Sequence, residues 1–296
     1  MQASAAPSDL LRDWLSESGR VFVLTGAGCS TASGIPDYRD ARGEWKRTPP
    51  VQFRDFVGDP LTNARYWARS LVGWPMVSQA VPNGAHRALA QAQAAGWLSR
   101  LVTQNVDGLH QRAGSDGVID LHGRIDRVAC LQCAASTARV EMQERLADAN
   151  PGWSGLVAGA APDGDAYLEG RDFSRFRVPA CLACGGTLKP DVVFFGENVP
   201  RARYEAAREA LRQADALLVV GSSLMVYSGF RFARMAHEAG QPIAIVSLGL
   251  TRADALASLK VQADCAETLQ RALTPREPAD RPGASASTPA SAWPPA

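Results

Sequence analysis

The chain has 296 residues, of which 46% are hydrophobic and 21% are charged, and its formal net charge is +1. A chain of this length and composition can bury one large core with a smaller companion. The near-zero charge argues against nucleic acid as a partner, and no apolar run reaches the roughly 18 residues that a membrane span needs. The N-terminal residues lack the basic and apolar regions of a secretory signal, and six cysteines are too few for a disulfide scaffold. We therefore expect a cytoplasmic protein with reduced thiols and no membrane partner.

Short apolar runs alternate with helical stretches along most of the chain. The runs end in glycine or a polar residue, as buried strands do, and they cover residues 21–26, 100–105, 118–123, 191–197, 216–223 and 242–249. Helices are expected at 85–96, 201–214 and 229–240. This alternation predicts an α/β fold, in which a parallel sheet carries helices on both faces. The informative polar residues sit at the carboxyl ends of the strands, where ligands bind in such sheets.

Three regions depart from this alternation. Residues 40–80 hold prolines and three tryptophans and predict a helical excursion with loops. Residues 126–189 hold the paired cysteines and predict an inserted zinc-binding module, so the larger domain is expected to consist of 8–125 and 190–273. Residues 274–296 are rich in proline, alanine and serine and predict a disordered tail.

The first expected strand ends in TGAGCSTASGIPDYR. Gly26 and Gly28 allow a tight turn beside a ligand, and a helix that starts there would offer N–H groups to a phosphate. Arg39 could pair with a pyrophosphate. The motif is not a full GxGxxG, and no acidic residue closes a second strand about 20 residues on, as dehydrogenases require. The sequence thus indicates a nucleotide site without hydride transfer, with an ordinary tight turn as the alternative.

Two CxxC pairs, Cys130/Cys133 and Cys181/Cys184, predict a closed tetrahedral zinc site. Four thiolates leave no open position, so the zinc is expected to be structural rather than catalytic. Redox-active pairs are the alternative, but the two matched pairs and the glycines that follow the second favour zinc. Cys29 is expected to serve as a small apolar side chain.

His122 follows an apolar strand, and the amide–carboxylate cluster at 104–107 is expected at a neighbouring strand end. With a reference pKa of about 6.5, this histidine is a candidate general base. His110 is the competing candidate and is expected to be peripheral, whereas His86 is expected to open a helix. Two segments, FFGENVP and GSSLMVYSG, could present backbone edges between which an extended peptide binds, although plain strand-to-loop transitions fit them equally.

The motifs GAGCSTASGIPDYR, TQNVDGLH, LHG, the two CxxC pairs, KPDVVFFGE and GSSLMVYS occur in this order. Together they resemble the sirtuins, over about residues 8–272. The resemblance implies an NAD-dependent protein lysine deacylase with a Rossmann-like domain and a small zinc domain. The segments RYWARSLVGWP, APDGDAYL and LTRADALASLK further resemble the class II branch, which includes the mitochondrial sirtuin four, and point to a bacterial member.

The resemblance also implies roles for particular residues. NAD would be bound by Gly26, Ala27, Gly28, Ser30, Ile35, Asp37, Arg39, Gln104, Asn105, Asp107, Gly221, Ser222, Ser223, Ser247, Gly249 and Cys265. The acyl-lysine peptide would contact Val193, Phe195, Gly196, Glu197 and Val226. His122 would be the proton acceptor, with Asn105 as the second catalytic residue, and the four paired cysteines would hold one zinc ion per chain.

The implied reaction transfers the acyl group to the ribose of NAD. The acyl oxygen attacks the ribose carbon as nicotinamide leaves, and His122 helps to deprotonate a ribose hydroxyl. The deprotonated hydroxyl attacks the resulting imidate, and water then releases free lysine and O-acyl-ADP-ribose. Mono-ADP-ribosyl transfer to protein at the same NAD site is the alternative. Tyr66 and Arg69 are similar to a YxxR pair that reads acidic acyl groups in class III sirtuins, and an ordinary helix face is the alternative there.

Overall fold

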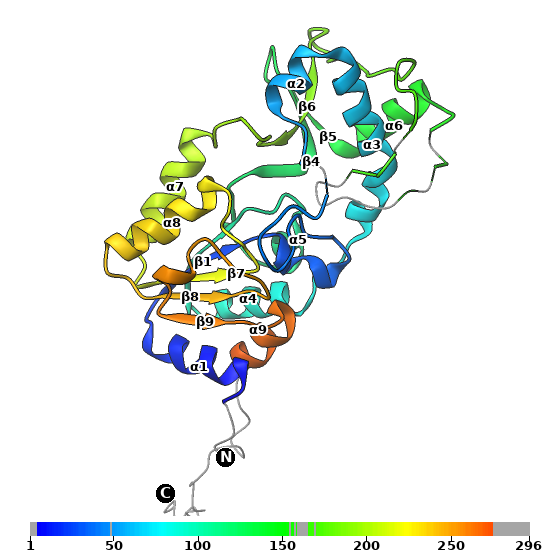
Figure 1. Ribbon diagram of the computed structural model, residues 1–296. Helices are drawn as coiled ribbons and strands as arrows, with labels where there is room; N and C mark the ends of the chain where they lie inside the picture. Colours follow the sequence, from blue (N-terminus) through cyan, green and yellow to red (C-terminus); the bar gives the residue numbers. More distant parts are fainter. Residues whose placement is uncertain are drawn as a thin grey trace, which may run out of the picture.

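The structure is a computed structural model that describes residues 5–47, 49–153, 155–156, 158, 165–168 and 170–274. The tail expected to be disordered lies outside the described residues from 275 onwards, as does most of the glycine-rich stretch after residue 153. The described chain forms a six-stranded sheet and a three-stranded sheet (Figure 1).

The larger sheet is parallel throughout, with the strand order β3-β2-β1-β7-β8-β9. Its strands are β1 (Val21–Thr25), β2 (Leu98–Thr103), β3 (Ile119–Asp120), β7 (Ala216–Val220), β8 (Ile243–Val246) and β9 (Leu259–Val261). Every residue of β1, β7 and β8 is buried, because helices cover both faces of the sheet. The predicted α/β fold is confirmed.

Alternate residues of β1 point to the two faces of the sheet, and each face has its own core. Val21 and Val23 pack in a cluster with residues of α1 (Pro7–Glu17), α4 (Gly84–Ala94) and α9 (Cys265–Leu273). Phe22 and Leu24 pack in a second cluster with α7 (Arg201–Arg212) and α8 (Tyr227–Glu238), which lie together on the opposite face in Figure 1.

Among the described residues, no helix is long and apolar enough to cross a membrane.

The smaller sheet is antiparallel, with the order β5-β4-β6. Its strands are β4 (Gly123–Cys130), β5 (Ser136–Ala138) and β6 (Leu188–Val192). β4 and β6 share a core with three helices, α2 (Phe53–Gly58), α3 (Pro60–Gln79) and α6 (Arg139–Ala149). Helices are therefore present in the predicted 40–80 excursion, and they cover the smaller sheet. This sheet reaches beyond 126–189 at both ends, since β4 begins at Gly123 and β6 ends at Val192.

Three predictions about elements were wrong. Residues 191–197 are no strand of the parallel sheet: β6 ends at Val192 in the antiparallel sheet, and Phe194 packs in the core of the smaller unit. The expected strand 118–123 contracts to β3. No α-helix follows β1; two short 3₁₀ turns, Ala27–Cys29 and Thr31–Ser33, do so instead. The remaining short elements are α5 (Leu109–Arg112) and a 3₁₀ turn at Asp254–Leu256.

Candidate active site

A cavity of about 810 Å³ lies where β1, β2, β7 and β8 end and where the loop after β6 meets them. Every residue expected to contact NAD or the peptide lines this one cavity, and so does His122. The fold therefore brings these residues together from seven separate segments, 26–39, 104–107, 122, 193–197, 221–226, 247–249 and 265. Their individual roles stay predictions.

The turns after β1 and β7 interlock without room for side chains. The N–H of Gly26 donates to the carbonyl of Val220 at 3.0 Å, and that of Gly28 donates to the carbonyl of Gly221 at 2.8 Å. A Cβ atom on Gly26 would lie 2.7 Å from the Cβ of Ser222. Gly221 adopts a φ of +61°, which favours glycine. These glycines let two backbone turns form the cavity floor, which is the open cradle that a dinucleotide phosphate needs.

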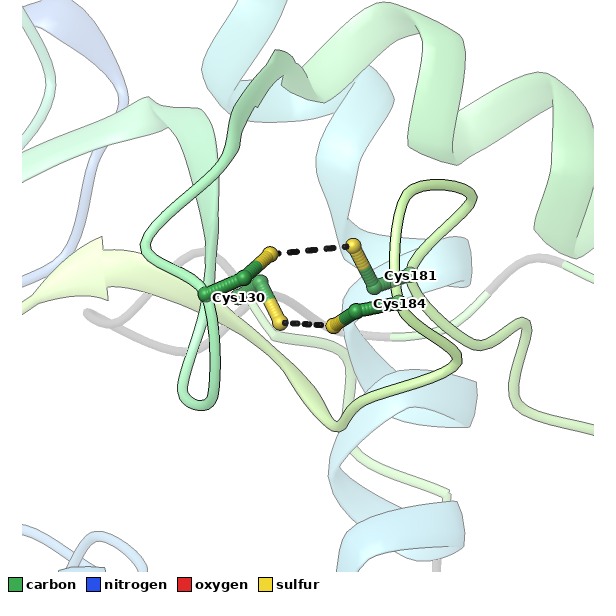
Figure 2. A group of neighbouring side chains, drawn as sticks. Cys130, Cys181 and Cys184 are labelled. Atoms are coloured by element: carbon green, nitrogen blue, oxygen red, sulfur yellow. Dashed lines mark hydrogen bonds between the residues drawn. The ribbon is translucent and has the colours of Figure 1, made fainter.

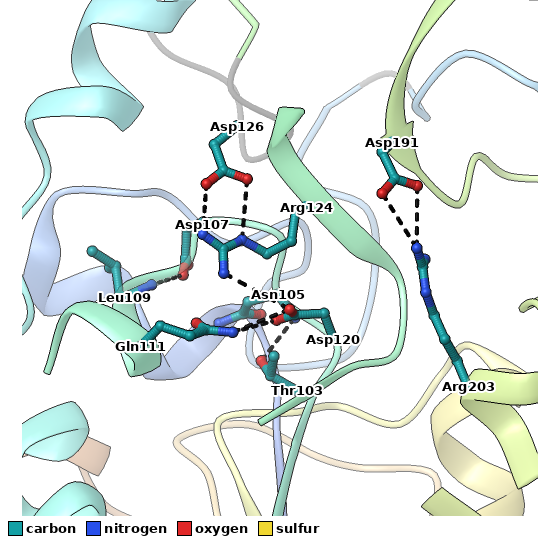
Figure 3. Close-up of polar contacts among 10 residues, drawn as sticks. All are labelled: Thr103, Asn105, Asp107, Leu109, Gln111, Asp120, Arg124, Asp126, Asp191 and Arg203. Atoms are coloured by element: carbon teal, nitrogen blue, oxygen red, sulfur yellow. Dashed lines mark hydrogen bonds and ion pairs between the residues drawn. The ribbon is translucent and has the colours of Figure 1, made fainter. Parts of the chain in front are cut away.

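Polar side chains at the end of β2 hold one another in place. Asn105 Nδ2 donates to the carbonyl of Gly26 and to Ser30 Oγ, both at 3.0 Å. Ser30 Oγ donates to Asp107 Oδ2 at 2.7 Å, and the other carboxylate oxygen of Asp107 accepts from the Leu109 N–H at 2.9 Å (Figure 3). A ligand therefore meets amide and carboxylate groups whose orientation is already set.

Both ring nitrogens of His122 have partners. Nδ1 lies 3.0 Å from the carbonyl oxygen of Gln104, and Nε2 lies 2.8 Å from Ser228 Oγ. Because a carbonyl only accepts, Nδ1 carries the proton and Nε2 presents its lone pair. Desolvation lowers the pKa of His122 to about 4, although the bond to Gln104 opposes this, and Arg231 and Arg203 lower the pKa further. The ring is thus neutral at physiological pH and able to accept a proton.

Glu197 braces the loop after β6 from within, and backbone bonds join this loop to the rest of the site. The Glu197 carboxylate accepts from the Phe194 N–H at 2.7 Å and from Lys189 Nζ at 2.9 Å. The carbonyl of Phe195 accepts from the Phe53 N–H at 2.8 Å, so that side of the proposed peptide edge is already paired. The Val193 N–H donates to the backbone carbonyl of His122 at 2.8 Å, which joins this loop to the candidate base.

Only one member of the YxxR pair reaches the cavity. Tyr66 lines it and packs against Phe194, with ring centroids 5.1 Å apart. Arg69 is absent from the lining: its Nε donates to the carbonyl of Ala166 at 2.9 Å and lies 3.9 Å from Asp165 Oδ2.

Sequence reasoning missed several residues of the cavity wall. Trp45 packs edge to face on Phe195, with ring centroids 5.6 Å apart, and the Arg39 guanidinium lies 3.9 Å from the centroid of the Trp45 ring. Arg39 also donates to the carbonyl of Gly43 at 2.7 Å, so the side chain that was expected to bind a phosphate is held against the cavity wall. Trp45 lies in a loop without a periodic hydrophobic pattern, so only the size of its side chain could have indicated a place in the cavity wall. Ser228 lies inside the quoted GSSLMVYSG motif, but its partner is distant in sequence.

The four paired cysteines form one cluster, and none of them lines the cavity. Figure 2 shows Cys130, Cys181 and Cys184 of this cluster. The four sulfur atoms all lie within 4.8 Å of one another, with Cys130–Cys184 at 3.5 Å and Cys133–Cys181 at 3.8 Å. A tetrahedron with Zn–S bonds of about 2.3 Å has edges of about 3.8 Å, so the donor set fits zinc. A Cβ on Gly186 would lie 2.9 Å from the sulfur of Cys130, which explains the glycine of the second knuckle.

His110, the competing candidate, does not line the cavity, and it is buried rather than exposed. It is 1% exposed, and its Nε2 lies 2.9 Å from Thr25 Oγ1. His86 opens α4 as expected, since its Nδ1 accepts from the Asn83 N–H at 3.3 Å in a capping box. Cys29 is buried, and this burial raises its thiol pKa well above the ordinary value, in keeping with an apolar role. These three residues bring nitrogen and sulfur atoms within 4.8 Å of one another, but none of them lines the cavity.

The fold and site define an α/β nucleotide-binding enzyme with an accessory four-thiolate zinc module. The family model described as the Sir2 family matches residues 26–228, and the chain belongs to this family, the sirtuins. A relative from Bordetella bronchiseptica, named NAD-dependent protein deacetylase, is 61% identical over 264 residues, covering 88% of this chain and 96% of the relative. NAD-dependent protein deacetylase 1 from Streptomyces coelicolor is 53% identical over 244 residues, covering 82% of each chain.

Solved structures give the same result. A Sir2 structure with a p53 peptide and NAD+ matches with a TM-score of 0.72 and 32% identity, over 90% of this chain and 97% of that one. A Sir2 structure bound to an acetylated peptide matches with a TM-score of 0.70 and 31% identity, over the same shares of both chains.

Proposed function

We propose that this chain is an NAD-dependent protein lysine deacylase that releases nicotinamide, free lysine and O-acyl-ADP-ribose. The observation that carries the proposal is the neutral His122, which lines the cavity together with both predicted sets of ligand-binding residues and whose Nε2 carries no proton. The relatives named NAD-dependent protein deacetylase, and the Sir2 structures holding peptide and NAD+, support it.

NAD, when bound, supplies the ribose carbon that nicotinamide leaves and the acyl oxygen attacks. The glycine turns at 26–28 and 221 would hold its phosphates. Asn105 and Asp107 would orient the ribose and the carboxamide, because their side chains are already fixed by Ser30 and Gly26. His122 would take a proton from a ribose hydroxyl at Nε2, while the carbonyl of Gln104 stabilises the proton that Nδ1 keeps.

We propose that the preferred acyl groups are uncharged. The inner wall of the cavity includes Val51, Tyr66, Ile125 and Phe194, which offer no partner for a carboxylate comparable with an arginine. The only arginine of the YxxR pair is directed to the carbonyl of Ala166 and to Asp165. A free carboxylate on the acyl chain would therefore be desolvated without a cationic partner at this position, which is costly.

Two finer assignments accompany this function as proposals. We place the chain in the class II, sirtuin-four-like branch as a bacterial member, on the strength of the three segments that resemble that branch. We also propose a cytoplasmic location, which fits six cysteines that are all free of disulfides.

The test is nicotinamide release from NAD with peptides that carry acetyl-, lipoyl-, glutaryl- or long-chain acyl-lysine. We expect turnover with at least one neutral acyl group and little with glutaryl. His122→Ala should lower turnover by about 10²-fold or more, as loss of a general base does. His237→Ala, on an exposed helix position, is the matched control. The absence of nicotinamide release with every peptide would overturn the proposal. Labelled ADP-ribose that stays on the protein would instead favour mono-ADP-ribosyl transfer.

A further inference from the structure

The bond between Ser228 and His122 has a function of its own. We propose that Ser228 is a positioning residue that holds the lone pair of His122 Nε2 in the free enzyme and yields it to the ribose hydroxyl when NAD binds. The inference rests on the proposed role of His122 as the base. Ser228 lines the same cavity as His122, so a ligand hydroxyl can reach both.

The direction of the hydrogen bond follows from the partners. The carbonyl of Gln104 fixes the proton on Nδ1, so Nε2 has one in-plane lone pair and no hydrogen. At 2.8 Å, Ser228 Oγ must therefore donate its hydrogen to Nε2. Ser228 donates only to the neutral ring, because protonation of Nε2 reverses the bond and makes Ser228 Oγ the acceptor. In the neutral ring, Ser228 thus occupies the Nε2 lone pair and fixes the ring plane.

The hydroxyl is free for this task because α8 does not use it. Ser228 is the second residue of α8, and the N-cap residue, Val226, makes no side-chain cap. The N-terminal end of α8 lies beside His122, because Ser228 contacts the ring there, and such an end disfavours a nearby cation. Loss of the serine hydroxyl would remove its bond to His122 without altering the helix.

Charged groups around His122 come from two helices and one strand. Arg231 on α8 and Arg203 on α7 both disfavour the imidazolium form. Arg203 Nη2 donates to Asp191 Oδ1 of β6 at 3.1 Å, so its charge is partly balanced. Since these groups stay in place when only Ser228 changes, the effect of the serine can be measured separately.

A single lone pair cannot serve two donors. The ribose hydroxyl can give its proton to Nε2 only after Ser228 has released that position, and the serine hydroxyl is then free to turn and bond elsewhere. The Ser228 bond should therefore act on the free enzyme and be absent from the complex with NAD and peptide. This separates the inference from a purely structural role, which would affect both states alike.

The experiment compares pH profiles of Ser228→Ala, Ser228→Thr and the wild type with a neutral acyl-lysine peptide. The acid limb of kcat/KM reports the free enzyme and that of kcat reports the complex. Ser228→Ala loses a neutral bond in the unprotonated state and a stronger charge-assisted bond in the protonated state, so proton affinity should fall by roughly five-fold, about 0.7 pH unit. We expect this downward shift in the kcat/KM limb of Ser228→Ala, an unchanged kcat limb, and wild-type limbs for Ser228→Thr. Ser78→Ala, whose hydroxyl bonds the carbonyl of Pro75, is the serine control.

Two outcomes would overturn the inference: an unchanged kcat/KM limb in Ser228→Ala, or equal shifts in both limbs. An NMR titration of the His122 ring, assigned with His122→Ala, gives the same pKa without turnover and should show the same fall. If His122→Ala instead retained wild-type turnover, the proposed base would be wrong. If His122→Ala were inactive and Ser228→Ala had wild-type limbs and an unchanged ring pKa, only the role of Ser228 would be lost.

Discussion

Individual histidines make the stability of this chain depend on pH. Burial lowers the pKa of His86 to about 4 and that of His110 well below its ordinary value, and desolvation lowers the pKa of His122 to about 4. Above pH 6.5 each is neutral whether folded or unfolded, so none contributes. Below pH 6.5 the unfolded chain binds protons that the folded chain refuses. The free energy of unfolding should therefore fall between pH 6.5 and 4, by up to about 1.4 kcal/mol per pH unit for each histidine. Calorimetric unfolding across this range measures the slope.

Substitution of one buried histidine tests the cause. His110→Gln keeps a polar side chain without a titrating ring, so it should lower overall stability and also flatten the slope by about a third. His237→Ala, at an exposed position, should leave the slope unchanged. Carboxylates with lowered pKa values, such as Asp40 and Asp254, destabilise only below their ordinary value of 3.8, and the raised pKa of Asp120 acts in the opposite sense. Equal slopes in the two variants would contradict the assignment to the histidines.

At the scale of elements, the sequence predicts what depends on local pattern. Buried strands such as β1 and β7 read as unbroken apolar runs because both their faces are covered. The run at 191–197 looks the same, yet its residues divide between the antiparallel sheet and a loop in which Gly196 adopts a φ of +86°. Periodicity cannot tell which sheet an apolar run will join. The contact between Ser228 and His122 could not be predicted either, because 106 positions separate the two residues.

The interlocked turns after β1 and β7 give a prediction at this scale. Gly221→Ala forces a left-handed backbone on alanine, and its Cβ would also collide with the backbone nitrogen of Cys29. Gly240→Ala is the matched control, since φ is +73° there and no atom lies within 4 Å of a Cβ. Both should lose about 1 kcal/mol to backbone strain. Gly221→Ala should lose a further ~1–3 kcal/mol and weaken NAD binding about tenfold or more, because the turns must separate. Denaturant unfolding and titration calorimetry with NAD distinguish the two variants, and equal NAD affinities would show that the turns tolerate separation.

At the scale of the whole molecule, the active site depends on how the two sheets are joined. Arg124 of β4 bonds Asp126 at 2.6 Å and lies 3.8 Å from Asp120, while Arg203 of α7 bonds Asp191 of β6 (Figure 3). These side chains are partly exposed, so each pair contributes little. Backbone bonds add to them: the Ile125 N–H donates to the carbonyl of Val106 at 2.9 Å. The proposed peptide-binding residues at 193–197 are therefore positioned by the smaller sheet, and the proposed NAD-binding residues at the ends of β1, β2, β7 and β8 are positioned by the larger one.

Removal of zinc should consequently impair deacylation much more than NAD binding. Without the metal, the four thiolates lose the ion that holds two knuckles together, and the small antiparallel sheet keeps only its packing on α2, α3 and α6 and its bonds to the larger sheet. We expect a chelator, or Cys184→Ala, to lower deacylation about 10²-fold because the loop at 193–197 loses its support, while NAD affinity changes less than about tenfold. Hydrogen exchange should show lost protection at 123–130 and 188–192 and retained protection at 21–25 and 216–220. Cys29→Ala should keep one zinc per chain, because its sulfur lies outside the four-thiolate cluster. If zinc-free protein kept full activity, the peptide side of the cavity would have to be held by the larger sheet alone, and the division of labour between the two sheets would be wrong.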